Sequence, residues 1–483
     1  MLSRREAVLL AVIFIASLPA VTTRLYSSDE VQYYSYLRSL WFDHDVSFEN
    51  EYRYFYDHHV AQTPDFYDTF LVRTEAATGR RINYATMGCA ILWAPFYGIA
   101  DLSVRAMRAA GRDIPADGYS WPYVWAVAYA SAFYGFAAVV LAILAARRTV
   151  GKRALSSGLV IWAGTPLLFY TYVAPPFSHA GSAFAVALFV SLWLHVRNTW
   201  SVPGAVALGL AGALMAMVRE QDIFFALGVA ADFALTLVRT HTPHAVRQRI
   251  VAALAGCAAF AAGYLPQLLA YHALNGSPGP SPLVARKMYW YAPHALQVLI
   301  DTNHGFFFWT PLAVLAVAGL ILMTAAPRGS MLDAVTPGST MSGGPRGAAS
   351  DLRRIGACLL LMLALQVYIS GAVESWTVAG AFGQRRFVAT TIILVIGLAA
   401  LREWIRGAAA RVAAHVALAI CIWWNVALIA EFGTSMMNRQ RLELKRNAYD
   451  AFVTLPRMAP ELVRRYFTER SSFYRPAEPR RDP

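Results

Sequence analysis

Two adjacent carboxylates follow the first long apolar run of the chain. They are Asp29 and Glu30, and residues 31–41 after them place apolar side chains at positions 31, 34, 37 and 41, on one face of a helix. This pattern predicts an amphipathic helix at a membrane surface, with the acidic pair at its N-terminal end. Either a carboxylate accepts the proton of an incoming hydroxyl group as a catalytic base, or the pair only caps the helix.

Further polar residues lie in loops that we expect on the same side of the membrane as Asp29. Arginine side chains there could bind a phosphate group bidentately, or they could extend towards lipid headgroups. The candidate phosphate-binding residues are Arg219, Arg286, Lys287, Arg385 and Arg386. The candidate cavity-lining residues are His179, Asp222, His304 and Glu374.

The composition predicts that membrane-spanning helices position these residues. Of the 483 residues, 57% are hydrophobic and only 15% are charged, whereas soluble domains carry about 25% charged residues. The mean hydropathy is +0.42, and the apolar residues form runs of roughly the length that spans a bilayer. A soluble enzyme, a disordered chain and a nucleic-acid-binding protein are therefore disfavoured. The net charge of +13 fits basic clusters between spans better than a nucleic-acid partner.

We predict an all-α polytopic membrane protein with about eleven spans. The expected spans are residues 7–23, 121–146, 154–172, 180–195, 205–218, 223–238, 250–271, 306–325, 355–373, 387–401 and 412–430. The apolar segment 84–104 is expected to dip into the membrane or lie along it without crossing. If it crossed, most basic loops downstream would move to the outer side, against the positive-inside rule.

This topology divides the chain into a transmembrane module, residues 1–430, and a short basic C-terminal tail, residues 431–483. Within the module, residues 24–120 form the first extracytoplasmic loop, with its interfacial helices. The four cysteines lie in apolar runs without metal-ligand spacing. We expect a multi-pass protein of the cytoplasmic (inner) membrane whose functional site faces the extracytoplasmic side.

A transferase on that side needs an activated donor that the membrane itself carries, because nucleotide sugars are normally absent there. A polyprenyl-phosphate sugar meets this need. Its phosphate would require cations near the interface, and its prenyl chain would require an apolar groove. A single carboxylate base suffices for an inverting displacement, whereas retaining hydrolysis usually uses two opposed carboxyl groups.

At these residues the sequence resembles the GT-C glycosyltransferases, in the branch of protein O-mannosyltransferases, aminoarabinose transferases of lipid A and RgtA/B/C/D-like bacterial enzymes. That family has an acidic motif after its first span and an interfacial helix next, matched here by Asp29, Glu30 and residues 33–41. Segments 37–45, 50–52, 88–95, 304–311 and 382–386 are similar to uncharacterised bacterial members.

The resemblance covers most of the chain to about residue 430, although only the acidic pair is a specific motif. It implies a GT-C fold, Asp29 as the general base, outer arginines that bind the lipid phosphate, and a glycan, lipid or protein as acceptor. The Pro-rich motif that often precedes the second span is absent at residues 83–88, and the tail is too short for the folded periplasmic domain of some members.

Other readings remain open. A divalent cation could be bound by acidic and histidine residues of the first loop, although their spacing matches no standard zinc pattern. These residues are Asp43, His44, Asp45, Asp57, His58 and His59. A polyprenyl-linked lipid or sugar transporter or flippase is the main alternative class, but transporters usually show internal repeats and charges at mid-membrane. A non-catalytic assembly subunit with the same fold is a third reading.

Overall fold

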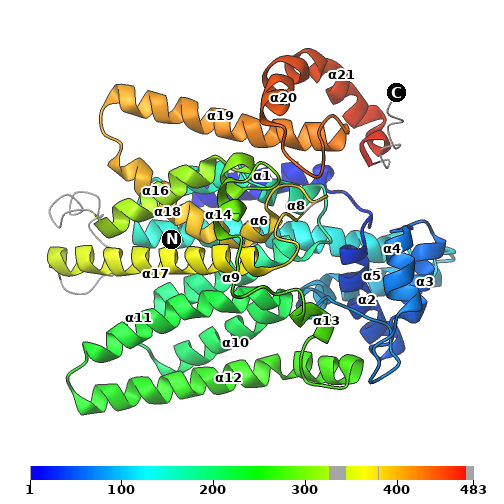
Figure 1. Ribbon diagram of the computed structural model, residues 1–483, viewed down its shortest axis with the longest axis horizontal. Helices are drawn as coiled ribbons and strands as arrows, with labels where there is room; N and C mark the ends of the chain where they lie inside the picture. Colours follow the sequence, from blue (N-terminus) through cyan, green and yellow to red (C-terminus); the bar gives the residue numbers. More distant parts are fainter. Residues whose placement is uncertain (1, 326–343, 379, 475–483) are drawn as a thin grey trace.

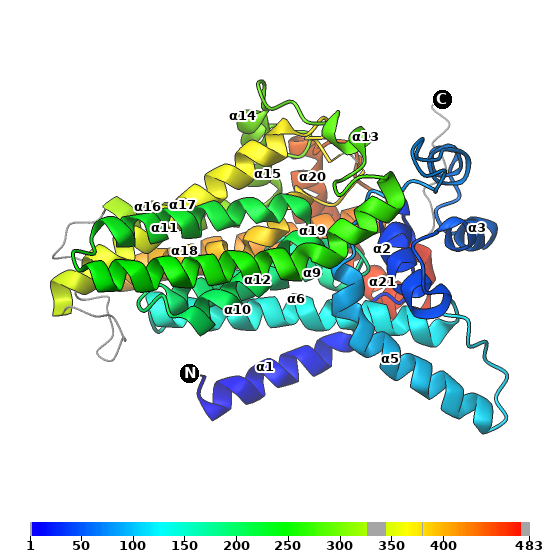
Figure 2. The same ribbon diagram turned by 90° about the horizontal axis from the view of Figure 1, so that it is seen from below.

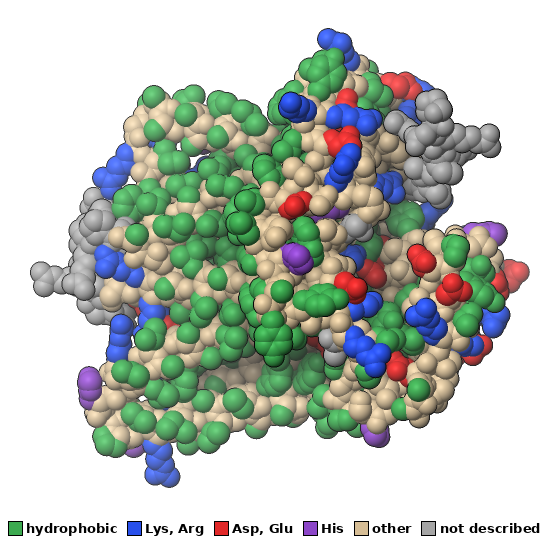
Figure 3. All heavy atoms as spheres, in the orientation of Figure 1, with side chains coloured by type: hydrophobic (Ala, Val, Ile, Leu, Met, Phe, Trp, Pro, Cys, Tyr) green, Lys and Arg blue, Asp and Glu red, His purple; other side chains and the backbone are tan. Residues whose placement is uncertain are grey.

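The computed structural model describes residues 2–325, 344–378 and 380–474, and Figure 1 shows them as a bundle of helices. The described residues form no β-strand beyond two isolated bridges, Thr74 with Arg81 and Met288 with Val373. Figure 3 shows hydrophobic side chains over most of the bundle, whereas acidic side chains gather at the end that holds α2 (Ser28–Arg38), α3 (Glu49–Asp57) and α4 (Pro64–Phe66). The prediction of an all-α membrane protein is confirmed.

Each of the eleven predicted spans is helical. Among the described residues, seven helical segments are long and apolar enough to cross a membrane: α6 (Trp121–Thr149), α9 (Ser178–Val196), η4–α11 (Glu220–Val238), α12 (Pro243–Asn275), α17 (Ser350–Ala372 of Gly344–Ala372), η5–α18 (Arg385–Trp404) and α19 (Ala408–Gly433). The others are shorter helices: α1 (Arg4–Ser17), α7 (Ala154–Ala163), α10 (Val202–Val218) and α16 (Leu312–Ala325).

Two spans that we predicted as continuous helices are interrupted. The run 154–172 is divided into α7 and α8 (Leu167–Tyr172), with Pro166 at the break. The run 306–325 is divided into α15 (Phe306–Trp309) and α16, with Pro311 between them. Proline lacks the N–H group that would continue the helical hydrogen bonds, and its ring clashes with the preceding turn. The continuous boundaries predicted for these two spans are therefore wrong.

Glycines let neighbouring helices approach closely in the bundle. A side chain at Gly319 of α16 would clash with the carbonyl group of Gly397 in α18, and one at Gly209 of α10 would clash with that of Gly256 in α12. Small residues at such crossings bring two helix backbones into direct van der Waals contact. These contacts pack α16 tightly against α18 and α10 tightly against α12. The packed helices support the loops at the α2 end.

Helix α5 (Gly88–Ala109), which covers the ambiguous segment 84–104, does not follow the direction of the bundle. It packs against α6 and α2, and Figure 2 shows it running obliquely outwards from the bundle at the end that holds α2. This course agrees with a segment that enters the membrane region without crossing it. Whether it crosses stays a prediction.

The C-terminal residues fold back on the bundle. The part of the tail that the structure describes contains α20 (Leu444–Tyr449), η6 (Asp450–Thr454), α21 (Leu455–Thr468) and η7 (Arg470–Tyr474), placed beside the end of α19 (Figure 1). The indole N–H of Trp423 in α19 donates to the carbonyl of Ala451, at 3.0 Å. The amide of Asn447 donates to the buried carboxylate of Glu431. The domain boundary at residue 430 stays a prediction.

A buried ion pair joins three helices at the end of the bundle opposite to α2. Asp232 of α11 is fully buried and accepts hydrogen bonds from Arg197, at 3.0 and 3.1 Å, and from the indole of Trp193, at 3.0 Å. Arg354 of α17 adds a second cation at 2.6 Å. A charge in this setting is tolerated only because it has charged partners.

Removing this carboxylate should weaken the bundle. Asp232→Asn removes the buried negative charge that Arg197 and Arg354 share, so we expect the free energy of unfolding to fall by about 3 to 5 kcal/mol. The measurement is unfolding of the purified protein in detergent. Asp351→Asn is the matched control, because Asp351 pairs with the same Arg197 but its side chain is 21% exposed; its loss should cost less than about 1 kcal/mol. Equal losses in both variants would contradict this account.

Candidate active site

The two adjacent carboxylates have different surroundings. Glu30 is fully buried and accepts hydrogen bonds from the backbone N–H groups of Tyr26, at 2.6 Å, and Ser27, at 3.1 Å. The Ser27 hydroxyl accepts in return from the N–H of Glu30, which completes a capping box at the start of α2. Burial raises the pKa of Glu30 to about 8, against the opposing effect of these hydrogen bonds. The capping interpretation therefore describes Glu30.

Asp29 instead faces the cations of a distant segment. Its side chain is 40% exposed, and its Oδ2 lies 2.8 Å from Nη1 of Arg385, at the start of η5 (Arg385–Thr390). These residues are 356 positions apart in the sequence. The structure thus brings together the predicted base and one of the predicted phosphate-binding residues, and it leaves the carboxylate accessible.

Two more of the predicted cations surround this pair. The guanidinium of Arg385 lies over the ring of Phe177, 5.6 Å from its centre. Next to Phe177, at the start of α9, the Nδ1 atom of His179 lies 2.6 Å from Nη1 of Arg219. Arg219, Arg385 and Arg386 all interact electrostatically with His179. We call these three residues the arginine cluster.

The members of the arginine cluster are held by different partners. Arg386 is almost fully buried and donates to the backbone carbonyl and the hydroxyl of Ser375, at 2.9 and 3.0 Å. Asp222, which is fully buried, accepts from the hydroxyl of Ser182 at 2.5 Å and interacts electrostatically with Arg219. A site with three guanidinium groups and one accessible carboxylate is suited to an anionic group next to a proton donor.

Other predicted residues lie elsewhere or have supporting contacts. Lys287 lies over the ring of Tyr84, 5.0 Å from its centre, and its carbonyl accepts from the N–H of Glu374. Arg286 is exposed on the same loop, after α13 (Pro282–Ala285). Among the described residues, no contact joins these three to the arginine cluster.

His304 supports the loop that carries Arg385. Its Nε2 lies 3.1 Å from the carbonyl of Ala381, and its ring stacks on Trp309. Its own carbonyl accepts from the side-chain amide of Gln384. Burial lowers the pKa of His304 to about 4, and the charge of Arg385 acts in the same direction. His304 is therefore a neutral buried ring that positions residues 381–384.

Sequence reasoning did not select Tyr33 and Phe177, which lie beside the pair. Burial raises the pKa of Tyr33 well above its usual range, and Asp29, Arg219 and Ser178 all interact with its hydroxyl. Tyr33 follows Asp29 by four positions on α2, a spacing that places both on one helix face and could have indicated it. No sequence signal marked Phe177.

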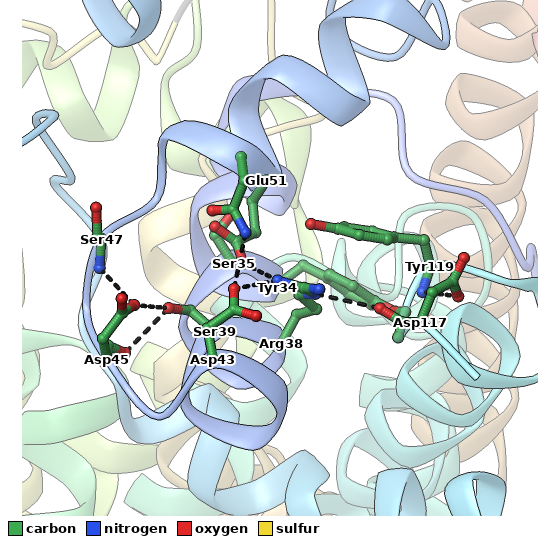
Figure 4. A network of polar contacts seen from close by, with 12 residues as sticks. Tyr34, Ser35, Arg38, Ser39, Asp43, Asp45, Ser47, Glu51, Asp117 and Tyr119 are labelled. Atoms are coloured by element: carbon green, nitrogen blue, oxygen red, sulfur yellow. Dashed lines mark hydrogen bonds and ion pairs between the residues drawn. The ribbon is translucent and has the colours of Figure 1, made fainter. Parts of the chain in front are cut away.

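The far end of α2 is fixed by Arg38 (Figure 4). Its guanidinium pairs with Glu51 of α3 at 2.9 Å and with Asp43, and its Nε donates to the carbonyl of Asp117 at 3.2 Å. It also lies over the ring of Tyr119, 4.6 Å from the centre. Burial raises the pKa of Glu51 to about 7, although the hydrogen bond from Arg38 opposes this. The network holds α2, and with it Asp29, in one orientation.

Several of the residues that we weighed as metal ligands have other partners. Asp43 accepts from Arg38 and Asn50, Asp45 accepts from Ser39 and Ser47, and the ring of His58 stacks on Tyr54 at 4.0 Å. Within the described ranges, no group of three or more His, Cys, Asp or Glu side chains is arranged to hold a metal ion.

A mostly apolar groove of about 960 Å³ begins beside the pair. Phe177, which contacts Arg385, and Tyr26 and Ser27, which precede Asp29, all line it. Its other walls come from α8, from residues 380–382, from the end of α19 and from the C-terminal residues 462–473. Thus a hydrophobic space adjoins a charged one, as an amphipathic ligand requires.

This arrangement of helices is already known in a solved structure. The chain is similar to ArnT from Cupriavidus metallidurans, bound to undecaprenyl phosphate, with a TM-score of 0.51 and 14% sequence identity. The similarity covers 98% of this chain and 79% of that chain. The chain has the GT-C fold.

The GT-C fold is found here without a recognisable sequence relative. No family model matches the chain, and no curated protein matches it. The expectation of a GT-C fold is thus confirmed by the structural similarity, while the assignment to a branch of the GT-C glycosyltransferases stays a prediction. The site residues also stay predictions, supported by their placement in the structure.

The different roles of Glu30 and Asp29 can be tested through stability. The pKa of Glu30 is about 8 in the folded protein against an ordinary value of 4.5, so the folded state holds a proton that the unfolded state releases between these values. The contribution of Glu30 to the free energy of unfolding therefore falls as the pH rises through this window. Glu30→Gln keeps the cap and removes the titration. We expect its Tm to fall less than that of the parent protein between about pH 5 and about pH 8, by a few degrees.

The control is Glu469→Gln, which alters an exposed carboxylate and should follow the parent protein at each pH. Both variants share the remaining titrating groups with the parent, so the comparison isolates Glu30. If Glu30→Gln loses as much Tm over this range as the parent protein does, Glu30 is not the buried proton-binding group described above.

Proposed function

We propose that the chain is an integral-membrane glycosyltransferase that moves a sugar from a polyprenyl-phosphate donor to an acceptor hydroxyl on the extracytoplasmic side of the cytoplasmic membrane. The observation that carries the proposal is the Asp29–Arg385 pair next to Phe177, which lines the apolar groove. A carboxylate that can accept a proton lies next to cations that can stabilise a departing phosphate. Sugar transfer from a lipid carrier needs both groups in one place.

The donor fits the two parts of the site. The arginine cluster would hold the phosphate, since guanidinium groups bind phosphate oxygens bidentately. The groove would take the prenyl chain, because its walls are mostly apolar. The similarity to a GT-C protein that binds undecaprenyl phosphate supports a carrier of this chemical class.

Transfer would proceed in one displacement. The acceptor hydroxyl attacks the anomeric carbon, and its proton passes to Asp29. The bond between that carbon and the phosphate oxygen breaks, and its electron pair remains on the polyprenyl phosphate, whose charge the arginine cluster stabilises. Attack from the face opposite to the leaving group inverts the anomeric configuration. In the absence of donor, the Asp29 carboxylate pairs with Arg385 at 2.8 Å.

His179 would position Arg219 for this step. The Nδ1 atom of His179 accepts the hydrogen bond from Arg219, so the proton of the neutral ring lies on Nε2. The ring of His179 also packs against Tyr170 and Phe177, at 4.5 and 5.8 Å between ring centres. The same aromatic surface therefore orients Arg219 and Arg385 on either side of the proposed phosphate position.

The side of the membrane follows from charge. Most basic residues between the spans fall in loops at the end of the bundle opposite to α2, which the positive-inside rule assigns to the cytoplasm. The end with the Asp29–Arg385 pair would then face outwards. The acceptor would be a hydroxyl group of a glycan, a lipid or a protein that reaches this face.

Asp29→Asn tests the proposal directly. The amide keeps the size of the side chain but cannot take up the acceptor proton, so transfer should fall by about 10² to 10⁴-fold. The measurement is sugar transfer by the purified protein from a polyprenyl-phosphate sugar, with analysis of surface glycans in a strain that carries the variant. Asp57→Asn is the matched control, because Asp57 is an exposed carboxylate at the end of α3; it should transfer as the parent does.

A flippase gives the opposite result. Such a protein moves the lipid-linked sugar without breaking its glycosidic bond, so it needs no base and should tolerate Asp29→Asn. Two results together would contradict the transferase proposal and favour a flippase. They are unchanged surface glycans in this variant and a defect in lipid transport when the whole protein is removed.

A further inference from the structure

We propose that the C-terminal segment 455–474 is the outer wall of the apolar groove and gives the site its preference for long prenyl chains. This inference rests on the proposed function only for the kind of ligand, a polyprenyl phosphate. It assigns a binding role to residues that the sequence indicated only as a basic tail.

The segment is anchored at its beginning. The tail leaves α19 and returns along it, held by the hydrogen bond between Asn447 and the buried Glu431 and by the indole of Trp423, which donates to Ala451. Leu455, the first residue of α21, is buried. The start of α21 is therefore part of the packed structure.

The segment is also anchored at its end, on a different part of the chain. The guanidinium of Arg470 donates to the carbonyl groups of Pro19, at 2.6 Å, and Ala20, in η1 (Leu18–Ala20) at the end of the first span. Its side chain lies over the ring of Tyr466, 4.9 Å from the centre. The segment thus connects the last span to the first one, and the hydrogen bonds of Arg470 hold its C-terminal end in place.

Between these anchors, α21 presents an apolar face to the groove. Leu462, Val463, Tyr466 and Phe467 line the groove, at helical spacings of one, four and five positions. Phe473 of η7 joins them and is covered by the guanidinium of Arg465, 5.1 Å from its ring centre. The opposite wall includes Phe169 of α8 and Phe432 of α19.

The proposed wall would select for the length of the prenyl chain. A prenyl chain that starts at a phosphate on the arginine cluster first meets Phe177 and Tyr26. In the proposed binding mode a longer chain continues to α21, where the side chains of Val463 and Phe467 are 56% and 80% exposed. Covering these surfaces with chain removes apolar area from water or detergent, and this gain is available to long chains alone.

The test compares two probes on the purified full-length protein: undecaprenyl phosphate, and citronellyl phosphate, which has two isoprene units. Tyr466→Ala removes a side chain that lines the groove. Arg470→Ala removes the hydrogen bonds that hold the segment to Pro19 and Ala20. We expect each to weaken binding of undecaprenyl phosphate about tenfold, as removal of one large apolar contact does, and binding of citronellyl phosphate by less than about twofold. Arg457→Ala is the matched control, since Arg457 is exposed on the same helix and does not line the groove.

Equal weakening of both probes, or no weakening of undecaprenyl phosphate, would overturn the proposal. A second measurement on the unaltered protein covers the case in which a variant fails to fold. An undecaprenyl phosphate analogue with a photoreactive group on the distal part of its chain should label peptides from residues 455–474, and labelling confined to other regions would overturn the proposal. Neither measurement uses an acceptor, so a protein that binds in this way but transfers no sugar contradicts the proposed function alone.

Discussion

The candidate site depends on one ion pair between residues 356 positions apart, Asp29 and Arg385. Asp29 belongs to the first turn after the first span, and Arg385 to the start of a span near the end. Each would be costly to hold at a membrane interface without an opposite charge. Their pairing brings the first loop onto the aromatic surface of α8 and α9, and the groove begins where these parts meet. The charged residues and the apolar groove therefore lie next to each other.

The separation of roles between Asp29 and Glu30 shows how a helix terminus can build such a site. Successive residues on a helix point in directions about 100° apart, so one carboxylate turns back to cap α2 while its neighbour faces outwards. Glu30 fixes the first turn, and Arg38 with its acidic and aromatic partners fixes the last. Because both ends of α2 are held, Asp29 is presented at a defined position, although its own side chain is accessible.

The sequence predicted those features of the fold that depend on residues close together in the chain. Runs of apolar residues predicted the spans, and the acidic pair followed by an amphipathic pattern predicted α2 and its capping. The breaks at Pro166 and Pro311 could have been read from the prolines themselves. The pairing of Asp29 with Arg385 was expected only from the shared side of the membrane, and the failure of Arg286 and Lys287 to join them depends on loop packing that no local pattern encodes. The C-terminal segment beside the groove was missed for the same reason, because the contacts that hold it join residues far apart in the sequence: Arg470 with Pro19 and Ala20, Asn447 with Glu431, and Ala451 with Trp423.

The hydrogen bonds between Arg470 and the carbonyls of Pro19 and Ala20 have a consequence for the synthesis of the protein. Pro19, at the end of the first span, is synthesised 451 residues before Arg470. A nascent chain that has not yet reached Arg470 therefore lacks part of the lining of the groove. Competence to retain a lipid ligand would then be acquired in a single late step, after every span is already in the bilayer.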